Sequence, residues 1–342
     1  MDADITQLLL HINKLSEKDK RYLILNIKSG ATNPLQQRAS MITEFRRNIF
    51  KEEDIKCPHC QSKNIIGFGN YKERKRYRCK ECQRTFNEHT GTAVAYIHNM
   101  DKWVSYIYEM QTSPTLRILA RKIGICLDTS FNWRHKILKS LKIQGYKKLK
   151  GIAETDETFF RYSEKGNKKI IGRKIHKRGG KASKAGINKE QVAVITALDR
   201  RNHSVVEVAC RGRITSAKIN EKIGAWLDPK DLVLCTDSHR SYEAFSKKSE
   251  IVQKKVNVSK KQYVRDKMYH VQTVNSFHSN LKNWIRKFCG VATKYLQDYM
   301  DYFRILKLSG LKKGWETFLY FSLVSSSSFI KTKMIKQQYF RT

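Results

Sequence analysis

The sequence predicts a multidomain α+β protein in which two small modules precede a larger α/β domain. Two pairs of cysteines lie between residues 57 and 82, and two short helical segments joined through a glycine follow over 113–135. From residue 148 the pattern changes to runs of Val, Ile, Leu and Thr of strand length, separated by helical segments. The length of 342 residues and the hydrophobic content of 40% suit two or three packed domains.

The overall charge points to a polyanionic partner. The chain has 68 Lys and Arg against 31 Asp and Glu, which gives a net charge of +37. A field of this size favours nucleic acid, and the hydrophobic content excludes a purely disordered basic tail. We therefore expect double-stranded DNA as a partner.

The first module carries the spacing of a zinc ribbon, and we assign it to residues 51–92. The two knuckles read Cys57-Pro-His-Cys60 and Cys79-Lys-Glu-Cys82. Four thiolates at this spacing suit one tetrahedral, structural Zn²⁺. We expect His59, inside the first knuckle, to lie beside the metal rather than bind it. The remaining cysteines fit reduced thiols better than a disulfide framework.

Residues 1–50 are expected to form a helical N-terminal segment. The start of the chain has neither a basic n-region nor an apolar h-region, so no signal peptide is expected. The longest apolar stretch, near 318–324, is too short to span a bilayer. These features predict a cytoplasmic protein without a membrane partner.

Residues 93–145 are predicted to hold a helix-turn-helix that binds DNA. Ser113-Pro114 supplies a cap and a first helical residue, Gly124 permits a tight turn, and Asp128 or Thr129 caps the second helix. The second helix is rich in polar and basic side chains, as major-groove recognition requires. The side chains expected to contact DNA are Asn132, Arg134 and His135. An ordinary helical hairpin is the alternative.

Residues 146–310 are predicted to form an α/β domain with the RNase H-like order of elements. Three strands come first, then a helix at 216–227, a fourth strand and a long helix at 273–288. The expected strands are 152–160, 191–198, 203–210 and 231–236, and 311–342 is left as a C-terminal tail.

A basic insertion, residues 163–190, separates the first two strands. Its central part, 165–189, holds ten Lys or Arg and no acid. It contains the run Arg178-Gly-Gly-Lys181-Ala-Ser-Lys, in which Arg178 and Lys181 are expected to contact phosphates. The alternative is a solvated loop.

Two aspartates stand where an α/β sheet places its ligands. Asp156 lies in the first strand and Asp237 ends the fourth. In the RNase H-like order these strands are neighbours, so the two carboxylates should converge. Hard oxygen ligands in a basic protein suit Mg²⁺ or Mn²⁺ bound jointly with substrate phosphate, and two such ions serve phosphoryl-transfer chemistry. An isolated Asp would more often be a strand-end or cap residue.

The combination of motifs resembles bacterial insertion-sequence transposases with an N-terminal zinc ribbon and a DDE-type RNase H-like catalytic domain. The resemblance includes Thr-Asp156-Glu-Thr, the Arg-Gly-Gly-Lys insertion and the stretch from His270 to Lys282, and it runs from about 50 to 305. It implies binding of terminal inverted repeats, metal-dependent cleavage at the transposon ends and strand transfer by the freed 3′-hydroxyl.

The chain departs from the family pattern at the third acidic position. Many members carry Glu where this chain has Asn275, with a lysine seven residues on that matches Lys282; some carry Asn or His instead. Asn275, His278 and Lys282 fall within about 60° on one helix. The third active-site residue is therefore Asn275 or His278, with Lys282 holding phosphate.

Two other functions remain open at this stage. The loss of the third carboxylate favours an inactive or repurposed transposase that acts as a DNA-binding regulator, whereas Asp156, Asp237 and the basic insertion favour an active enzyme. A stand-alone RNase H-like nuclease is the second alternative. Because two transposon ends must be held together, a transposase is expected to act as a homodimer or a larger assembly on DNA.

Overall fold

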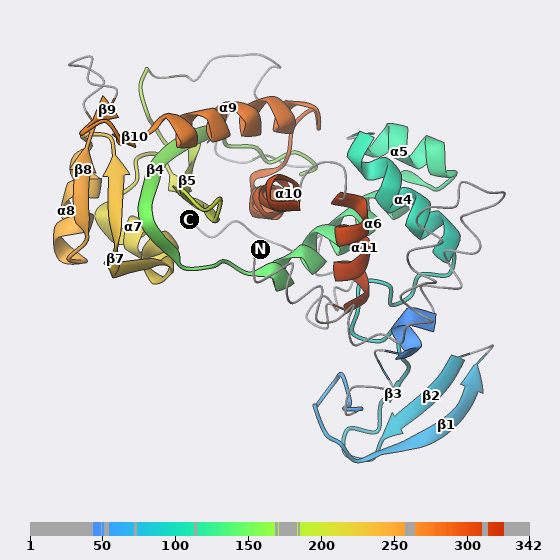
Figure 1. Ribbon diagram of the computed structural model, residues 1–342. Helices are drawn as coiled ribbons and strands as arrows, with labels where there is room; N and C mark the ends of the chain where they lie inside the picture. Colours follow the sequence, from blue (N-terminus) through green and yellow to red (C-terminus); the bar gives the residue numbers. More distant parts are fainter. Residues whose placement is uncertain are drawn as a thin grey trace. The chain divides into compact units, whose positions relative to one another are not determined.

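The computed structural model describes residues 44–48, 50, 55–71, 74–112, 115–167, 170, 183, 185–256, 264–309 and 314–324 (Figure 1). The chain divides into two compact units, which are described separately. The first comprises residues 1–90 and 94–108, and the second comprises 91–93 and 109–342. This division groups the two predicted DNA-binding helices with the α/β domain.

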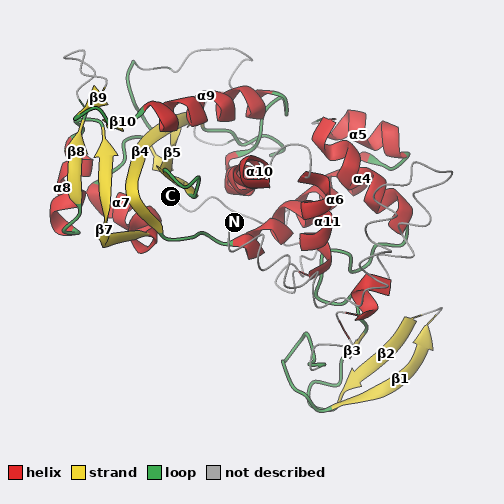
Figure 2. Cartoon of the chain, in the orientation of Figure 1, coloured by secondary structure: helices red, strands yellow, loops and turns green. Residues whose placement is uncertain are grey.

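The first unit contains a three-stranded antiparallel sheet in the order β1-β2-β3 (Figure 2). The buried cluster of this sheet is small: Cys57, Cys79 and Phe86 are buried, and Tyr77 stacks on Phe86 with 5.6 Å between ring centroids. A core of this size stabilises little by itself, which is why such modules depend on a metal. The strands are β1 (Ile65–Tyr71), β2 (Arg74–Cys79) and β3 (Thr85–Phe86), and the helix α4 (Met100–Thr112) comes later in the chain.

The helix pair α5 (Leu116–Ile123) and α6 (Leu127–Ser140) forms as predicted, but its caps differ. Thr115 caps α5, with its side chain accepting from the Ile118 amide, so the helix begins after Ser113-Pro114, which lie outside the described residues. Gly124 ends α5 in the left-handed region at φ 67°, which glycine adopts without strain. The thiol of Cys126, rather than Asp128 or Thr129, caps α6 by accepting from the Thr129 amide. The turn is therefore shorter than predicted.

The second unit is built around a five-stranded mixed sheet in the order β6-β5-β4-β7-β8. The first three strands along the chain are antiparallel, and β7 and β8 add in parallel on the other side of β4. The expected pairing of the first and fourth strands is confirmed, because Glu154 of β4 lies opposite Cys235 of β7. The strands are β4 (Leu149–Arg161), β5 (Gln191–Asp199), β6 (Ser204–Arg211), β7 (Leu227–Thr236) and β8 (Val252–Lys255).

Helices cover both faces of this sheet. Ile219 of α7 and Phe245 of α8 share a buried cluster with alternate residues of β4 to β7, such as Ala153 and Ile195. The opposite face of β4 and β5 packs against α9, and α10 packs on β6. Period-two alternation thus gives each strand one face toward α7 and α8 and one toward α9 and α10. The helices are α7 (Ser216–Ile223), α8 (Arg240–Lys248), α9 (Gln272–Arg286) and α10 (Leu296–Ser309).

Shorter elements complete the second unit. The strands β9 (Val264–Arg265) and β10 (Tyr269–His270) form a separate antiparallel pair before α9. A last helix, α11 (Gly314–Val324), lies where the sequence indicated only a tail. The 3₁₀ turns are η1 (Leu141–Gln144), η2 (Gly224–Trp226) and η4 (Thr293–Tyr295). No helix among the described residues is long and apolar enough to cross a membrane.

Candidate active site and metal centre

Asp156 and Asp237 come from the neighbouring strands β4 and β7. Asp156 is paired with Thr196 of β5 and lies two residues beyond Glu154, the last residue of β4 that pairs with β7. Asp237 directly follows β7, where its Oδ1 accepts from the His239 amide at 3.0 Å. Both side chains are partly exposed. The sheet therefore brings the two predicted carboxylates to one edge.

The electrostatics show that this edge is crowded with negative charge. Burial, followed by the nearby carboxylates of Glu157 and Asp237, raises the pKa of Asp156 to about 7, and the Lys282 ammonium partly opposes this rise. Like charges that share a poorly hydrated site favour protonation of one of them. A bound cation relieves the same repulsion, so this edge is suited to a divalent metal.

Helix α9 lies across the face of the sheet that carries Asp156 (Figure 1). His278 is buried on α9, with its Nδ1 3.7 Å from Asp156 Oδ2. Its Nε2 is also buried and has no hydrogen-bond partner in the described structure. Burial and the Lys282 ammonium lower the pKa of His278 to about 4, so the imidazole is neutral at pH 7 and free to accept or to bind a metal.

Asn275 and Lys282 stand on the same helix at greater exposure. Asn275 is exposed and Lys282 is partly buried. The charge of Lys282 reaches both Asp156 and His278, as the pKa shifts of those groups show. Between the two residues predicted for the third position, the one in contact with Asp156 is His278.

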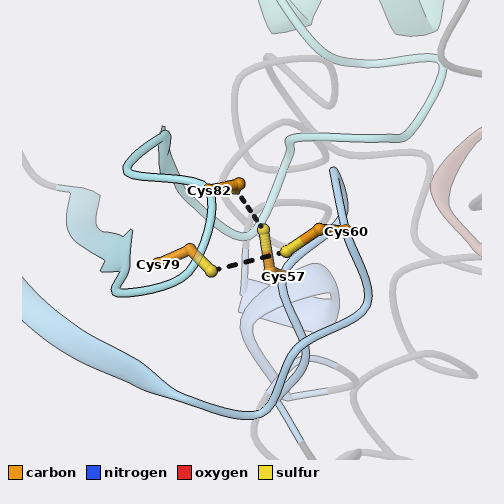
Figure 3. Close-up of side chains that lie close together, drawn as sticks. All are labelled: Cys57, Cys60, Cys79 and Cys82. Atoms are coloured by element: carbon orange, nitrogen blue, oxygen red, sulfur yellow. Dashed lines mark hydrogen bonds between the residues drawn. The ribbon is translucent and has the colours of Figure 1, made fainter.

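The four cysteines of the ribbon form a compact cluster. Their sulfur atoms all lie within 4.8 Å of one another, and the Cys57–Cys82 and Cys60–Cys79 sulfur pairs are each 3.5 Å apart (Figure 3). Zn–S bonds of about 2.3 Å in a tetrahedron place sulfur atoms just under 4 Å apart, so the four thiols fit one zinc ion.

The backbone supports this arrangement of thiols. The residue after each knuckle, Gln61 and Gln83, adopts a left-handed conformation with φ of 63° and 58°. The His59 amide donates to Cys57 Sγ, and amide donation from Cys82 lowers the pKa of Cys79 to about 7. Within the described residues no other group of three or more His, Cys, Asp or Glu side chains gathers this closely.

Comparison with known proteins identifies the α/β domain. Residues 148–304 match the family described as the ISXO2-like transposase domain. This range contains Asp156, Asp237, Asn275, His278 and Lys282. The α/β domain is therefore similar to insertion-sequence transposases.

A relative from an insertion sequence agrees with this match. The chain is 25% identical over 266 residues to an uncharacterized protein in transposable element ISH50 of Halobacterium salinarum, covering 77% of this chain and 88% of the relative. The resemblance of the chain to insertion-sequence transposases is thereby confirmed.

Solved structures of the Mos1 transposase also align with the chain. A pre-cleavage Mos1 transpososome matches with 10% identity and a TM-score of 0.20, over 93% of this chain and 96% of the other. The Mos1 mariner paired end complex with Mn matches with 11% identity and a TM-score of 0.22, over 95% and 99%. At these TM-scores the alignments support no argument about fold or site.

The predicted DNA contacts of α6 are wrong for two residues. Arg134 and His135 are 1% and 2% exposed, because α6 packs against α10 and α11. The Arg134 guanidinium lies 5.4 Å from the ring centroid of Phe288, which belongs to the transposase domain. Asn132 is partly exposed, so its DNA contact stays a prediction, whereas Arg178 and Lys181 lie outside the described residues.

Sequence reasoning missed Glu157 beside the acidic edge of the transposase domain. Its carboxylate accepts from the Tyr242 hydroxyl of α8 at 2.7 Å, and burial raises its pKa. Glu157 follows Asp156 directly, so alternation points it toward α8 while Asp156 points toward α9. That period-two signal was present in the sequence, but the hydroxyl partner could be identified only from the fold.

Proposed function

We propose that the chain is an active DNA transposase that binds the terminal inverted repeats of an insertion sequence and catalyses strand cleavage and strand transfer. The transposase domain supplies the class of function, and the convergence of Asp156 and Asp237 supplies the chemistry. The strand order β6-β5-β4-β7-β8 supports an RNase H-like domain, in which the central strand and its parallel neighbour carry the acidic residues.

Asp156 and Asp237 are proposed to hold Mg²⁺ or Mn²⁺ together with oxygen atoms of the DNA. The observation that carries this proposal is the convergence of the two aspartates at one edge of the sheet, where burial, together with the carboxylates of Glu157 and Asp237, raises the pKa of Asp156 to about 7. Magnesium is commonly bound by only one or two carboxylates plus substrate phosphate, so a third acid is not required. When bound, such ions stabilise negative charge on the attacking and leaving oxygen atoms.

Residues of α9 are proposed to complete the site. His278 places its Nδ1 3.7 Å from Asp156 Oδ2, and its Nε2 has no hydrogen-bond partner among the described residues, which suits the ring to orient the carboxylate or to bind metal or phosphate. Lys282 provides a cation close to the same carboxylate and is proposed to hold a phosphate of the DNA strand. Asn275 is exposed on that helix and is the alternative third ligand.

DNA binding is proposed to rest on several basic surfaces. The net charge of +37 and the basic insertion at 163–190 favour phosphate contacts. Because Arg134 and His135 are buried, we assign contact by the helix pair to the exposed Arg117 and Arg121 of α5. Two DNA ends must be held at once, so the protein is proposed to act as a homodimer or a larger assembly.

The ribbon is proposed to bind one structural zinc ion through Cys57, Cys60, Cys79 and Cys82. Metal analysis of freshly purified protein should find about one zinc per chain, and Cys79→Ser should lose it and unfold the ribbon. The α/β sheet should stay folded, because its core is formed by residues of the second unit alone. Purified protein without zinc would refute this assignment.

One assay separates the proposed function from its alternatives. Purified protein, Mg²⁺ and labelled DNA carrying the element's ends are incubated, and cleaved and joined products are scored separately. A transposase gives both, a stand-alone nuclease gives cleavage only, and a repurposed DNA-binding regulator gives neither while still binding the ends. Asp237→Asn should lower cleavage by on the order of 10³-fold or more and leave DNA binding intact, because the loss of a metal ligand raises the activation barrier by several kcal/mol.

A further inference from the structure

A buried carboxylate on β4 has a role that neither the family match nor the proposed chemistry assigns. Glu154 is 1% exposed and stands two residues before Asp156, on the same face of the strand. A buried carboxylate is costly unless it is paired and hydrogen-bonded. Its partners therefore indicate why it is there.

Glu154 caps the first turn of α9. Its Oε2 accepts hydrogen bonds from the Thr273 and Val274 amides at 2.8 and 3.0 Å. The residue at the cap position of α9 itself, Val271, has no side-chain oxygen and makes no side-chain cap. The first amides of α9 therefore find their acceptor on the sheet. The Glu154 carboxylate is favoured at this position because the N-terminal end of a helix carries partial positive charge.

The other oxygen of Glu154 forms an ion pair with Arg200, which lies in the turn after β5. Arg200 Nη1 lies 2.9 Å from Glu154 Oε1, and His270 Nδ1 lies 3.3 Å from it. Arg200 also donates to the Met268 carbonyl at 3.2 Å and to the Thr273 hydroxyl at 3.3 Å. The cluster therefore joins β4, the turn after β5 and the start of α9.

The spacing of these contacts couples the cap to the active site. Glu154 and Asp156 are separated by two strand residues, or about 6.6 Å. Val274 and His278 are separated by four helical residues, or about 6 Å. The two distances match, so Glu154 at the Val274 amide and Asp156 at the His278 ring are consecutive contacts between one strand and one helix. A helix displaced by one residue would lose both.

We propose that Glu154 is a positioning residue that fixes the rotation and axial position of α9, so that His278 and Lys282 face Asp156. The proposal rests on the proposed function for its catalytic consequence, but the cap can be tested without activity. Glu154 is not proposed to touch DNA or metal, since its Oε2 accepts from two amides of α9 and its Oε1 forms an ion pair with Arg200.

The structural test is amide hydrogen exchange in the full-length chain. Glu154→Gln keeps the shape and one weaker acceptor, and Glu154→Ala removes the acceptor. Exchange at the Thr273 and Val274 amides should rise by roughly tenfold in Glu154→Gln and further in Glu154→Ala, since charge-assisted hydrogen bonds are about twice as strong as neutral ones. Glu207→Gln, a matched change at a partly buried carboxylate of β6 that accepts from the Tyr146 hydroxyl, should leave these amides unchanged. Unchanged exchange in Glu154→Gln would overturn the proposal.

The functional test is a double-mutant cycle with His278→Ala, using the strand-cleavage assay. Glu154→Gln alone should lower the cleavage rate by about 10–100-fold with little change in DNA affinity, as observed for residues that orient metal ligands. In the His278→Ala background, Glu154→Gln should lower the cleavage rate much less than it does in the wild-type protein, because the side chain that Glu154 positions is already absent. Full multiplication of the two effects would make Glu154 a general stability residue and would overturn the positioning role. If the wild-type protein neither cleaves nor joins DNA, the proposed function fails, and hydrogen exchange still decides the role of Glu154.

Discussion

Helices α9 and α6 make an instructive pair, because the sequence singles out both by their polar side chains and the structure uses them in opposite ways. On α9 the polar positions His278 and Lys282 face the acidic edge of the sheet. On α6 the polar positions Arg134 and His135 are buried among α10 and its neighbours. A polar helix face indicates a polar environment, and this environment can be the protein interior.

The buried surroundings of α6 contain charged partners for its polar side chains. Asp298 of α10 is fully buried and forms an ion pair with Lys139, whose Nζ lies 2.8 Å from Asp298 Oδ1. His135 Nδ1 lies 4.0 Å from the same carboxylate, and its ring is 4.2 Å from that of Tyr295. These contacts hold α6, and with it the pair of α5 and α6, against the transposase domain, so α6 has a structural role. The contrast with α9 can be tested residue by residue.

The largest effect on stability is expected for Arg134→Ala. The change removes a large buried side chain that packs on Phe288, so we expect the free energy of unfolding to fall by about 3 kcal/mol. Denaturant unfolding measures this loss. Arg121→Ala, on the exposed face of α5, is the matched control and should change stability by less than about 0.5 kcal/mol while weakening DNA binding. If Arg134→Ala leaves stability unchanged and weakens only sequence-specific DNA binding, then Arg134 contacts DNA after all.

A smaller effect, on activity alone, separates His278 from Asn275. His278→Ala should lower the cleavage rate by about 10–100-fold, because it removes the imidazole that contacts Asp156. Asn275→Ala should cost less, since Asn275 is exposed. Single-turnover cleavage with both variants at equal DNA occupancy decides between them. A silent His278→Ala beside an inactive Asn275→Ala would assign the third position to Asn275.

The last effect concerns the pH dependence of stability at the buried helix α6. Burial, with Lys139, Arg134 and Lys294 nearby, lowers the pKa of His135 to about 3. The unfolded chain takes up this proton near pH 6.5 and the folded chain does not, so stability is complete above pH 6.5 and falls as the pH drops toward 3. The contribution is about 1.4 kcal/mol per pH unit. His135→Phe should flatten the slope of unfolding free energy between pH 6 and 4.5 relative to wild type. An identical slope would mean that His135 is protonated in the folded state.

The sequence could predict those features that depend on local pattern. Period-two runs located four of the five strands of the main sheet, and the two Cys-x-x-Cys pairs located the sulfur cluster. The neighbouring positions of Asp156 and Asp237 followed from the order of elements and are supported by the pairing of β4 with β7. The choice between Asn275 and His278 could not follow, because both lie on one side of the helix and only the rotation fixed by Glu154 separates them.

The burial of α6 could not be predicted, because its partners are remote in sequence. Asp298 and the helix α11 lie about 160 to 190 residues after α6, and the range containing α11 read as a tail. The cap at Cys126 was missed for a different reason: a thiol is a weak acceptor, so the hydroxyl and carboxyl groups that follow were preferred. Distant contacts, rather than local propensity, decided both outcomes.

The order of pairing in the main sheet has a consequence for how the site comes into being during folding. Strands β4, β5 and β6 follow one another as an antiparallel meander, whereas β7 reaches β4 only across a crossover that pairs residue 154 with residue 235. Closing the longer loop costs more chain entropy, so the meander is expected to form first and β7 to dock later. Asp156 is then already in place on β4, and Asp237 comes close to it only when β7 pairs with β4. A chain halted before that step has part of the sheet but lacks the second carboxylate of the proposed metal site.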